Sequence, residues 1–179
     1  RLGIPLLFGQ DVIHGYQTVF PIPLAQSCSW DLEAIEQGAR IAAREASAQG
    51  INWVYSPMVD IALDPRWGRI AEGNGEDPFL GSRIGEAMIR GFQGNYGREN
   101  VMACVKHLVG GSLTSNGING SPADMSERML REVFLPPFKK CVDAGVFSLM
   151  PSHNDLSGIP CHGNRWLLTD LLKKEWGFK

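Results

Sequence analysis

Four short apolar runs, each followed by a longer amphipathic stretch, constrain the fold of this 179-residue chain more than any other feature. The runs are residues 5–8, 52–55, 102–105 and 147–150. Each is brief and apolar on all sides, which is typical of a strand buried on both faces of a parallel sheet. Alternation of strands and helices at this spacing predicts parallel βαβ units and therefore an α/β fold.

The segments between the first three runs carry helix start and stop signals. Ser29 is a candidate N-cap for a first helix, and Gly50 is expected to end it. A second helix is predicted over residues 78–91. Both segments have an apolar side that can face a sheet.

Two further helices are predicted in the second half of the chain. The sequence Asp124-Met125-Ser126-Glu127 resembles a capping box, and Pro136-Pro137 must kink or interrupt the helix that it opens. Asn164 is the expected cap of the last helix, which should end before Gly177.

Two architectures fit this order of elements, an open doubly wound sheet and a closed eight-fold barrel. An open, doubly wound sheet of four strands could complete its core within this length, whereas an eight-fold barrel needs roughly 250 residues. The pattern of strands and helices alone leaves both open, so the positions of the polar residues must be considered.

Polar, chemically capable side chains follow each apolar run directly. Asp11 follows the first run, and the second leads to a loop that contains Arg69. The third ends in Lys106-His107, and the fourth leads to His153. The carboxyl ends of parallel strands open on one face, so these side chains should converge there. Carboxylates accept from hydroxyls and cationic groups donate to them, which suits a polyhydroxylated ligand.

Each of these residues also has a structural interpretation. Asp11 could cap a turn, Arg69 could form a surface ion pair, and Lys106-His107 could be a solvated strand end. For His153 the two interpretations are balanced. Other polar residues are assigned structural roles: His14 as a satisfied histidine, and Glu72, Glu76 and Asp77 as supporting or helix N-terminal acids.

Composition argues against several classes of function. The 17 Lys and Arg nearly balance the 19 Asp and Glu, so no nucleic-acid or membrane partner is predicted. No phosphate-binding glycine motif occurs, and the histidines lack metal-ligand spacing, so neither cofactor nor metal is expected. The four cysteines form no C-x-x-C pair and are predicted to be buried free thiols.

A series of longer motifs connects these residues, and it covers essentially the whole chain. In order they are GQDVIHG (9–15), FPIPLA (20–25), DPRWGR (64–69), GEDP (75–78), KH (106–107), DMSER (124–128), LPPF (135–138) and NRWLLTD (164–170). Together they resemble the N-terminal barrel of glycoside hydrolase family 3, and in particular bacterial periplasmic β-glucosidases.

The resemblance implies a role for each candidate site residue. Asp11 matches the aspartate that grips hydroxyls of the non-reducing-end sugar in the −1 subsite. Arg69 matches a sugar-binding arginine, and Lys106 and His107 match a Lys-His pair that holds the same sugar. His153 stands where many members carry Tyr or Phe, so it is expected to affect the shape of the subsite.

The resemblance also implies what lies outside the chain. Residues 1–179 correspond to the central part of the barrel domain, an incomplete (β/α)8 TIM-like barrel that is truncated at both ends. The nucleophilic Asp of the retaining mechanism is expected just after Lys179, and the general acid/base in a C-terminal α/β domain of the same polypeptide. No catalytic carboxylate is assigned within the chain, which is expected to be inactive alone.

The expected activity is exo-acting, retaining β-glucosidase-type hydrolysis of a β-linked oligosaccharide or glucoside, in the periplasm or outside the cell. A β-xylosidase of the same family is an alternative. A non-catalytic sugar-binding relative is another, because Gly117-Ile118-Asn119-Gly120 replaces a G-R-D-Y-like segment common in the family. An aldolase-type barrel using Lys106 as a Schiff-base nucleophile is a further alternative.

Overall fold

The computed structural model describes residues 3–113 and 115–179, and it is built around a sheet of four parallel strands. The strands lie in the order β1-β2-β3-β4, and every neighbouring pair is parallel. Their bounds are Gly9–Gln10 for β1, Trp53–Val54 for β2, Met102–Leu108 for β3 and Ser148–Pro151 for β4. The predicted parallel α/β fold is confirmed.

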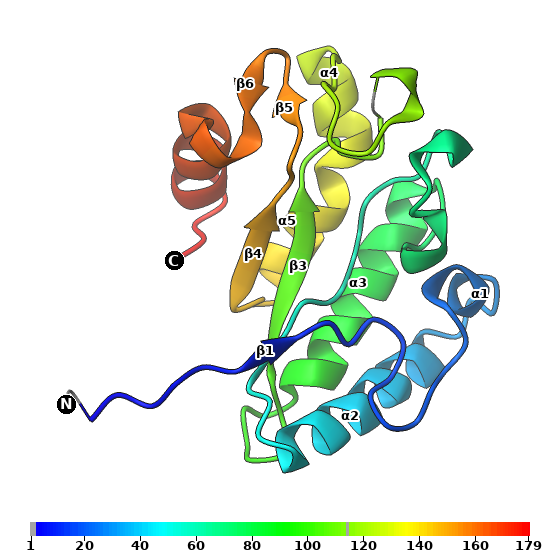
Figure 1. Cartoon of the computed structure of the whole chain (residues 1–179), viewed down its shortest axis with the longest axis vertical. Helices are drawn as coiled ribbons and strands as arrows, with labels where there is room; N and C mark the ends of the chain where they lie inside the picture. The colour runs from blue at the N-terminus through cyan, green and yellow to red at the C-terminus, as the bar shows by residue number, and fades with distance from the viewer. Residues whose placement is uncertain (1–2, 114) are drawn as a thin grey trace.

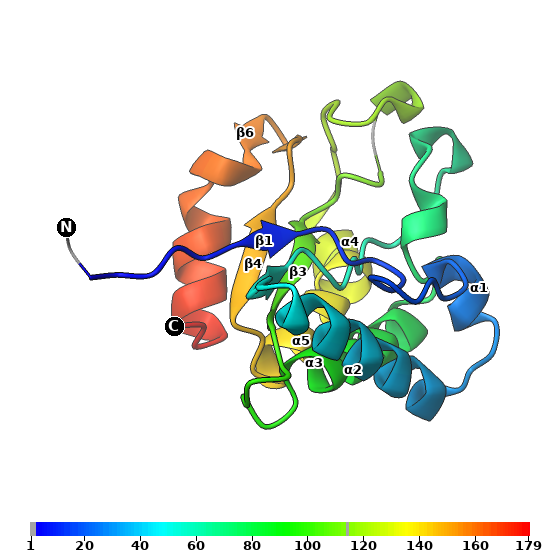
Figure 2. The ribbon, with the colours of Figure 1, turned by 60° about the horizontal axis from the view of Figure 1, so that its bottom comes forward.

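Helices connect the strands, and those between β2 and β4 cover one face of the sheet (Figures 1 and 2). The α-helices are α1 (Pro23–Ser27), α2 (Leu32–Ala48), α3 (Pro78–Gln93), α4 (Glu127–Met129) and α5 (Pro136–Asp143). Shorter 3-10 helices are η1 (Pro65–Trp67), η2 (Ile70–Glu72), η3 (Ser115–Gly117) and η5 (Cys161–Gly163). Two π-helices, η4 (Leu130–Phe134) and η6 (Trp166–Glu175), and a small hairpin, β5 (Asp155–Leu156) with β6 (Ile159–Pro160), complete the elements.

The first predicted strand, residues 5–8, is wrong. The strand begins only at Gly9, and Leu6 and Leu7 are 76% and 52% exposed. Pairing starts where the Phe8 carbonyl accepts from the Asn52 N–H at 2.9 Å. Residues 3–7 extend away from the sheet in Figures 1 and 2, so their apolar side chains have no neighbouring strand to pack against. The other three strands fall where the apolar runs predicted them.

The predicted helix starts are close but not all correct. Asp31, not Ser29, is the N-cap of α2, and its carboxylate accepts from the Ala34 N–H at 2.9 Å. The Ser29 hydroxyl instead accepts from the N–H of Asp31, the residue that precedes the first residue of α2. Asp77 caps α3 in the same way, with Pro78 in the first helical position, where its missing N–H costs nothing.

The interruption predicted at Pro136-Pro137 is confirmed. Ser126 is the N-cap of α4, and the chain then widens into the π-helix η4, where the Leu135 N–H donates to the Leu130 carbonyl at 2.9 Å. A new helix starts at Pro136 because proline cannot donate to the preceding turn. Asn164 caps the last helix as expected, accepting from the Leu167 N–H at 3.0 Å.

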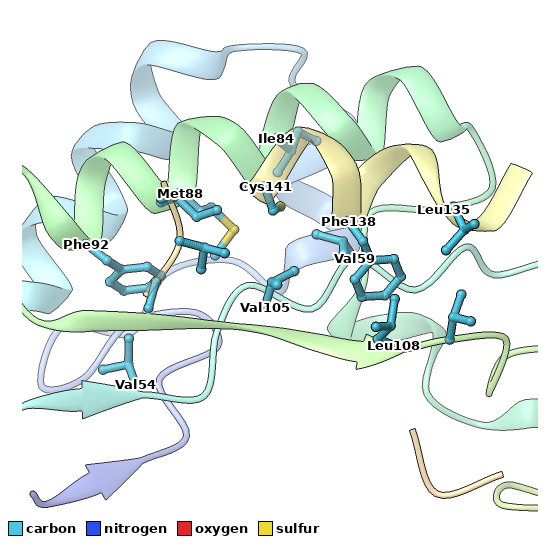
Figure 3. Packing of buried hydrophobic residues seen from close by; sticks show 14 of the residues in the cluster. Val54, Val59, Ile84, Met88, Phe92, Val105, Leu108, Leu135, Phe138 and Cys141 are labelled. Carbon is cyan, nitrogen blue, oxygen red and sulfur yellow. The ribbon is translucent and has the colours of Figure 1, made fainter. Parts of the chain in front are cut away.

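The core lies between the sheet and the helices α3 and α5 (Figure 3). Val54 and Val105 from the strands meet Phe92 of α3 and Phe138 of α5, and all four are essentially inaccessible. Burying side chains of this size contributes roughly 1.5–3 kcal/mol each. This packing fixes β3, the strand whose end carries Lys106.

The cysteines do not all behave as predicted. Cys104, Cys141 and Cys161 are buried free thiols, and burial raises the pKa of each. Cys28, however, is exposed, because it follows the short helix α1 at the surface. None of the helices in the described part of the chain is both long and apolar enough to cross a bilayer.

Candidate active site

A cavity of about 340 Å³ opens at the carboxyl ends of β1, β2 and β3. Its lining comprises Asp11, Ile13, His14, Ile22, Pro23, Arg69, Ala71, Glu72 and Lys106. The structure therefore brings Asp11, Arg69 and Lys106 together from three different strand ends. Two larger hollows, of about 580 and 690 Å³, lie along α2 and the turn after α3, and neither contains any of the predicted site residues.

Lys106 and Asp11 form the first charged pair of the cavity. The Lys106 Nζ lies 2.5 Å from Asp11 Oδ1. The lysine side chain is only 5% exposed, whereas that of Asp11 is 61% exposed. A buried ammonium group needs a compensating partner, which Asp11 supplies. The open side of the Asp11 carboxylate is then available to accept hydrogen bonds from a ligand.

Arg69 and Glu72 form the second pair, in the loop after β2. The guanidinium Nε and Nη2 donate to the two carboxylate oxygens of Glu72 at 2.7 and 2.8 Å. These hydrogen bonds hold the pKa of Glu72 below its ordinary value and raise that of Arg69, so both groups are charged at neutral pH. Within the described residues no hydrogen bond uses Nη1 of Arg69, which leaves that nitrogen for a ligand.

The local sequence explains how this loop presents Arg69. Asp64 caps η1 by accepting from the Arg66 N–H at 2.9 Å, and Pro65 supplies a helical φ angle. Gly68 then ends η1 with φ +83°, a conformation that favours glycine. Trp67 is buried beneath the loop, with its ring centroid 5.9 Å from the Arg69 guanidinium carbon, within cation–π range.

Two hydrogen bonds to the Asp60 carboxylate hold His107 in place. One carboxylate oxygen of Asp60 accepts from both the backbone N–H and Nδ1 of His107, at 3.1 and 2.8 Å. Both residues are buried. Because Nδ1 is engaged with the carboxylate, Nε2 is the ring nitrogen left for other contacts. His107 lies next to Lys106 but does not itself line the cavity.

Sequence analysis did not select Asp60 as a site residue. Its one signal was its place at the end of the polar segment that follows β2. Its partner lies 47 residues further along the chain, and no local pattern predicts that pairing. Glu72 was assigned a supporting role, and its fork with Arg69 gives that role a definite form.

The two remaining histidines near the strand ends differ in position. His14 contacts the Phe20 carbonyl through Nδ1 at 2.9 Å, a structural contact, and also borders the cavity. His153 is exposed and stacks on His162, with ring centroids 5.6 Å apart. The structure does not bring His153 to the cavity that Asp11, Arg69 and Lys106 share.

The chain is similar to known proteins along its whole length. The model of the glycosyl hydrolase family 3 N-terminal domain matches residues 1–179. A β-xylosidase of Formosa agariphila is 46% identical over 99% of this chain and 27% of its own length. A periplasmic β-glucosidase of Salmonella typhimurium is 44% identical over 100% of this chain and 24% of its own length.

A solved structure gives the same result. The crystal structure of a β-glucosidase from Listeria innocua superposes with a TM-score of 0.97, at 45% identity, over 99% of this chain and 25% of that one. Another crystal structure, of a mutant of that enzyme, holds laminaribiose. The chain thus spans about a quarter of the length of these relatives. The N-terminal domain of the family has a TIM-barrel-like α/β fold, which confirms the predicted incomplete barrel. This chain belongs to glycoside hydrolase family 3.

Proposed function

We propose that the protein containing this chain is an exo-acting, retaining β-glycosidase of the β-glucosidase type. In this proposal the chain supplies the side chains that hold the non-reducing-end sugar. The observation that carries it is the cavity at the strand ends, where the Asp11–Lys106 and Arg69–Glu72 pairs face one space.

Alternating acidic and basic groups suit a sugar because each hydroxyl both donates and accepts. The open carboxylate of Asp11 accepts from hydroxyls, while Lys106 and the free Nη1 of Arg69 donate to their oxygens. His107, fixed by Asp60, does not line this cavity, so its contact with the sugar remains a prediction from the family resemblance. The pairs are formed before any ligand arrives, so little side-chain ordering is needed on binding.

The carboxylates of this cavity fit binding better than bond cleavage. Retaining hydrolysis needs one carboxylate as nucleophile and a second carboxyl group as acid/base, about 5–5.5 Å apart. Asp11 and Glu72 are each engaged by a cationic group, which reduces their nucleophilicity. The family resemblance, rather than this geometry, assigns the nucleophile to an Asp just beyond Lys179 and the acid/base to a C-terminal α/β domain.

The names of the relatives support β-glucosides as substrates and a periplasmic or secreted location. Hydrolysis of β-xylosides is the second candidate, because a β-xylosidase is 46% identical to this chain. Xylose lacks the hydroxymethyl group of glucose, so a subsite that binds glucose needs additional space for that group.

The function is tested with the full-length wild-type protein and two substrates, an aryl β-glucoside and an aryl β-xyloside. Proton NMR of the first-formed sugar reports its anomeric configuration. The expected result is hydrolysis with the β-anomer formed first and with higher kcat/KM on the glucoside. Release of the α-anomer first would contradict the retaining mechanism, and binding of glucose without hydrolysis would indicate a non-catalytic relative.

The aldolase alternative has a separate test. A Schiff base on Lys106 would be trapped by borohydride in the presence of a carbonyl substrate, and peptide mapping would show the added mass. The proposed function predicts no reduced adduct on Lys106.

A further inference from the structure

The side chain of Asn119 joins the loop of residues 115–121 to residues 64–73, the loop that carries Arg69. Asn119 Oδ1 accepts from the indole Nε1 of Trp67 at 2.9 Å, across 52 residues of sequence. Trp67 is buried, and an indole nitrogen can only donate. The amide of Asn119 must therefore present its oxygen to the ring, which fixes its orientation.

The loop is built to hold Asn119 in place. The Ser121 hydroxyl lies 2.8 and 2.7 Å from the carbonyl oxygens of Ser115 and Ile118, which share its one proton, and this closes the loop on itself. Gly117 has φ +70°, and a Cβ there would collide with the Cβ of Arg66. Only glycine allows the loop backbone to rest directly on the segment that carries Trp67.

The contact continues from Trp67 to Arg69. The ring of Trp67 lies under the Arg69 guanidinium, and Glu72 grips the Nε and Nη2 edge of the same group. Among the described residues, the hydrogen bond that Trp67 donates to Asn119 is the one hydrogen bond between the 115–121 loop and residues 64–73. Asn119 thus sets the orientation of the ring on which the guanidinium rests.

We propose that Asn119 is a positioning residue that acts on Arg69 through Trp67. This inference rests on the proposed function of the cavity and deepens it. Asn119 lies in residues 117–120, which replace the G-R-D-Y-like segment common in the family. The proposal gives this altered segment a role in positioning Arg69. If the acceptor is lost, the buried N–H is unpaired and the ring can turn, which displaces the Arg69 side chain that lines the cavity.

The test is steady-state kinetics of the full-length enzyme on its aryl β-glycoside. Asn119→Ala is expected to raise KM about five- to tenfold, with kcat changed less than about twofold, because Arg69 holds the sugar before and during the reaction. Asn119→Asp keeps an acceptor and should restore KM to within about twofold of wild type. Ile118→Ala, at an exposed position of the same loop, is the matched control and should match wild type.

A double-mutant cycle separates this role from a general structural one. In an Arg69→Lys background the guanidinium is absent, so Asn119→Ala should add little further loss. Full additivity of the two changes would overturn the inference, as would an Asn119→Asp variant as impaired as Asn119→Ala. An inactive wild-type enzyme would instead overturn the proposed function and the inference with it. An active wild type with Asn119→Ala equal to Ile118→Ala overturns the inference alone.

Discussion

Each cationic group at the candidate site is tied to a carboxylate, and the two partners differ most in exposure in the Lys106–Asp11 pair. Lys106 is buried while its partner Asp11 is open. A rigid, partly dehydrated cation beside an accessible carboxylate can meet a hydroxyl without first breaking its own pair. The Arg69–Glu72 fork keeps one nitrogen free for the same purpose.

The Arg69–Glu72 fork makes a prediction about pH. The hydrogen bonds from Arg69 lower the pKa of Glu72 in the folded state below its ordinary value of 4.5. The folded state therefore holds the Glu72 proton less tightly than the unfolded state does. The resulting stabilisation is fully present above the unfolded pKa and is lost as pH falls through the lower, folded pKa.

Glu72→Gln should therefore lower the thermal midpoint of the full-length protein at pH 7, and the difference from wild type should shrink below about pH 4.5. Thermal unfolding at neutral and acidic pH measures it, with the exposed Glu76→Gln as the matched control. A deficit that stays constant from pH 7 into the acidic range would show that the pair contributes no charge-dependent stability.

At the residue scale, the sequence predicted which side chains belong to the site better than it predicted their hydrogen-bond partners. Asp11, Arg69 and Lys106 could be selected because each follows a buried strand, and strand ends of a parallel sheet share one face. The hydrogen bonds that orient the site, which His107 donates to Asp60 and Trp67 donates to Asn119, join residues about 50 positions apart. Such pairings depend on how loops fold back in space, which local patterns do not report.

At the scale of elements, α3 supports the site by packing closely on its neighbours. Gly91 faces α2, where a Cβ would collide with the Glu36 carbonyl oxygen and lie 2.6 Å from the Ala39 Cβ. Gly85 faces α5 and the segment after β2, where a Cβ would lie 2.8 Å from Cys141 Sγ and 2.9 Å from a methyl group of Val59. These glycines bring the helices close together at a cost in helix propensity.

Two glycine substitutions should have opposite effects on stability. Gly91→Ala should destabilise the protein by about 1–3 kcal/mol, because backbone atoms of α2 must move to admit the methyl group. Gly38→Ala should stabilise it by about 0.5–1 kcal/mol, because the nearest atoms are 3.9 Å away in the Phe20 ring and alanine favours helix. Thermal midpoints of the two full-length variants measure the difference, and equal shifts for both would contradict the packing.

The elements themselves were largely predictable, and the errors have physical causes. The interruption at Pro136 follows from a missing N–H, so the sequence alone reports it. The start of α2 was misplaced because Ser29 and Asp31 can both accept from a helix N-terminus. The run 5–8 looked like a strand by composition, but strand formation also requires a neighbour, and pairing begins only at Phe8.

At the scale of the whole molecule, the fold separates packing from chemistry. Helices and strands bury the core on one side of the sheet (Figure 3), while polar residues gather where β1, β2 and β3 end. The central claim is that this gathering holds the terminal sugar of a β-glycoside. The claim depends on two cationic residues, Lys106 from β3 and Arg69 from the loop after β2, which meet at one cavity.

The most direct measurement is kcat/KM of the full-length enzyme on an aryl β-glucoside, with Lys106→Ala and Arg69→Ala compared with wild type. Each change removes charged hydrogen bonds to the sugar, so each should lower kcat/KM about ten- to a hundredfold. Lys139→Ala removes a partly exposed lysine that pairs with Asp143 on α5, outside the cavity, and should leave kcat/KM unchanged. If Lys106→Ala and Arg69→Ala both behave like Lys139→Ala, the cavity is not the sugar-binding site.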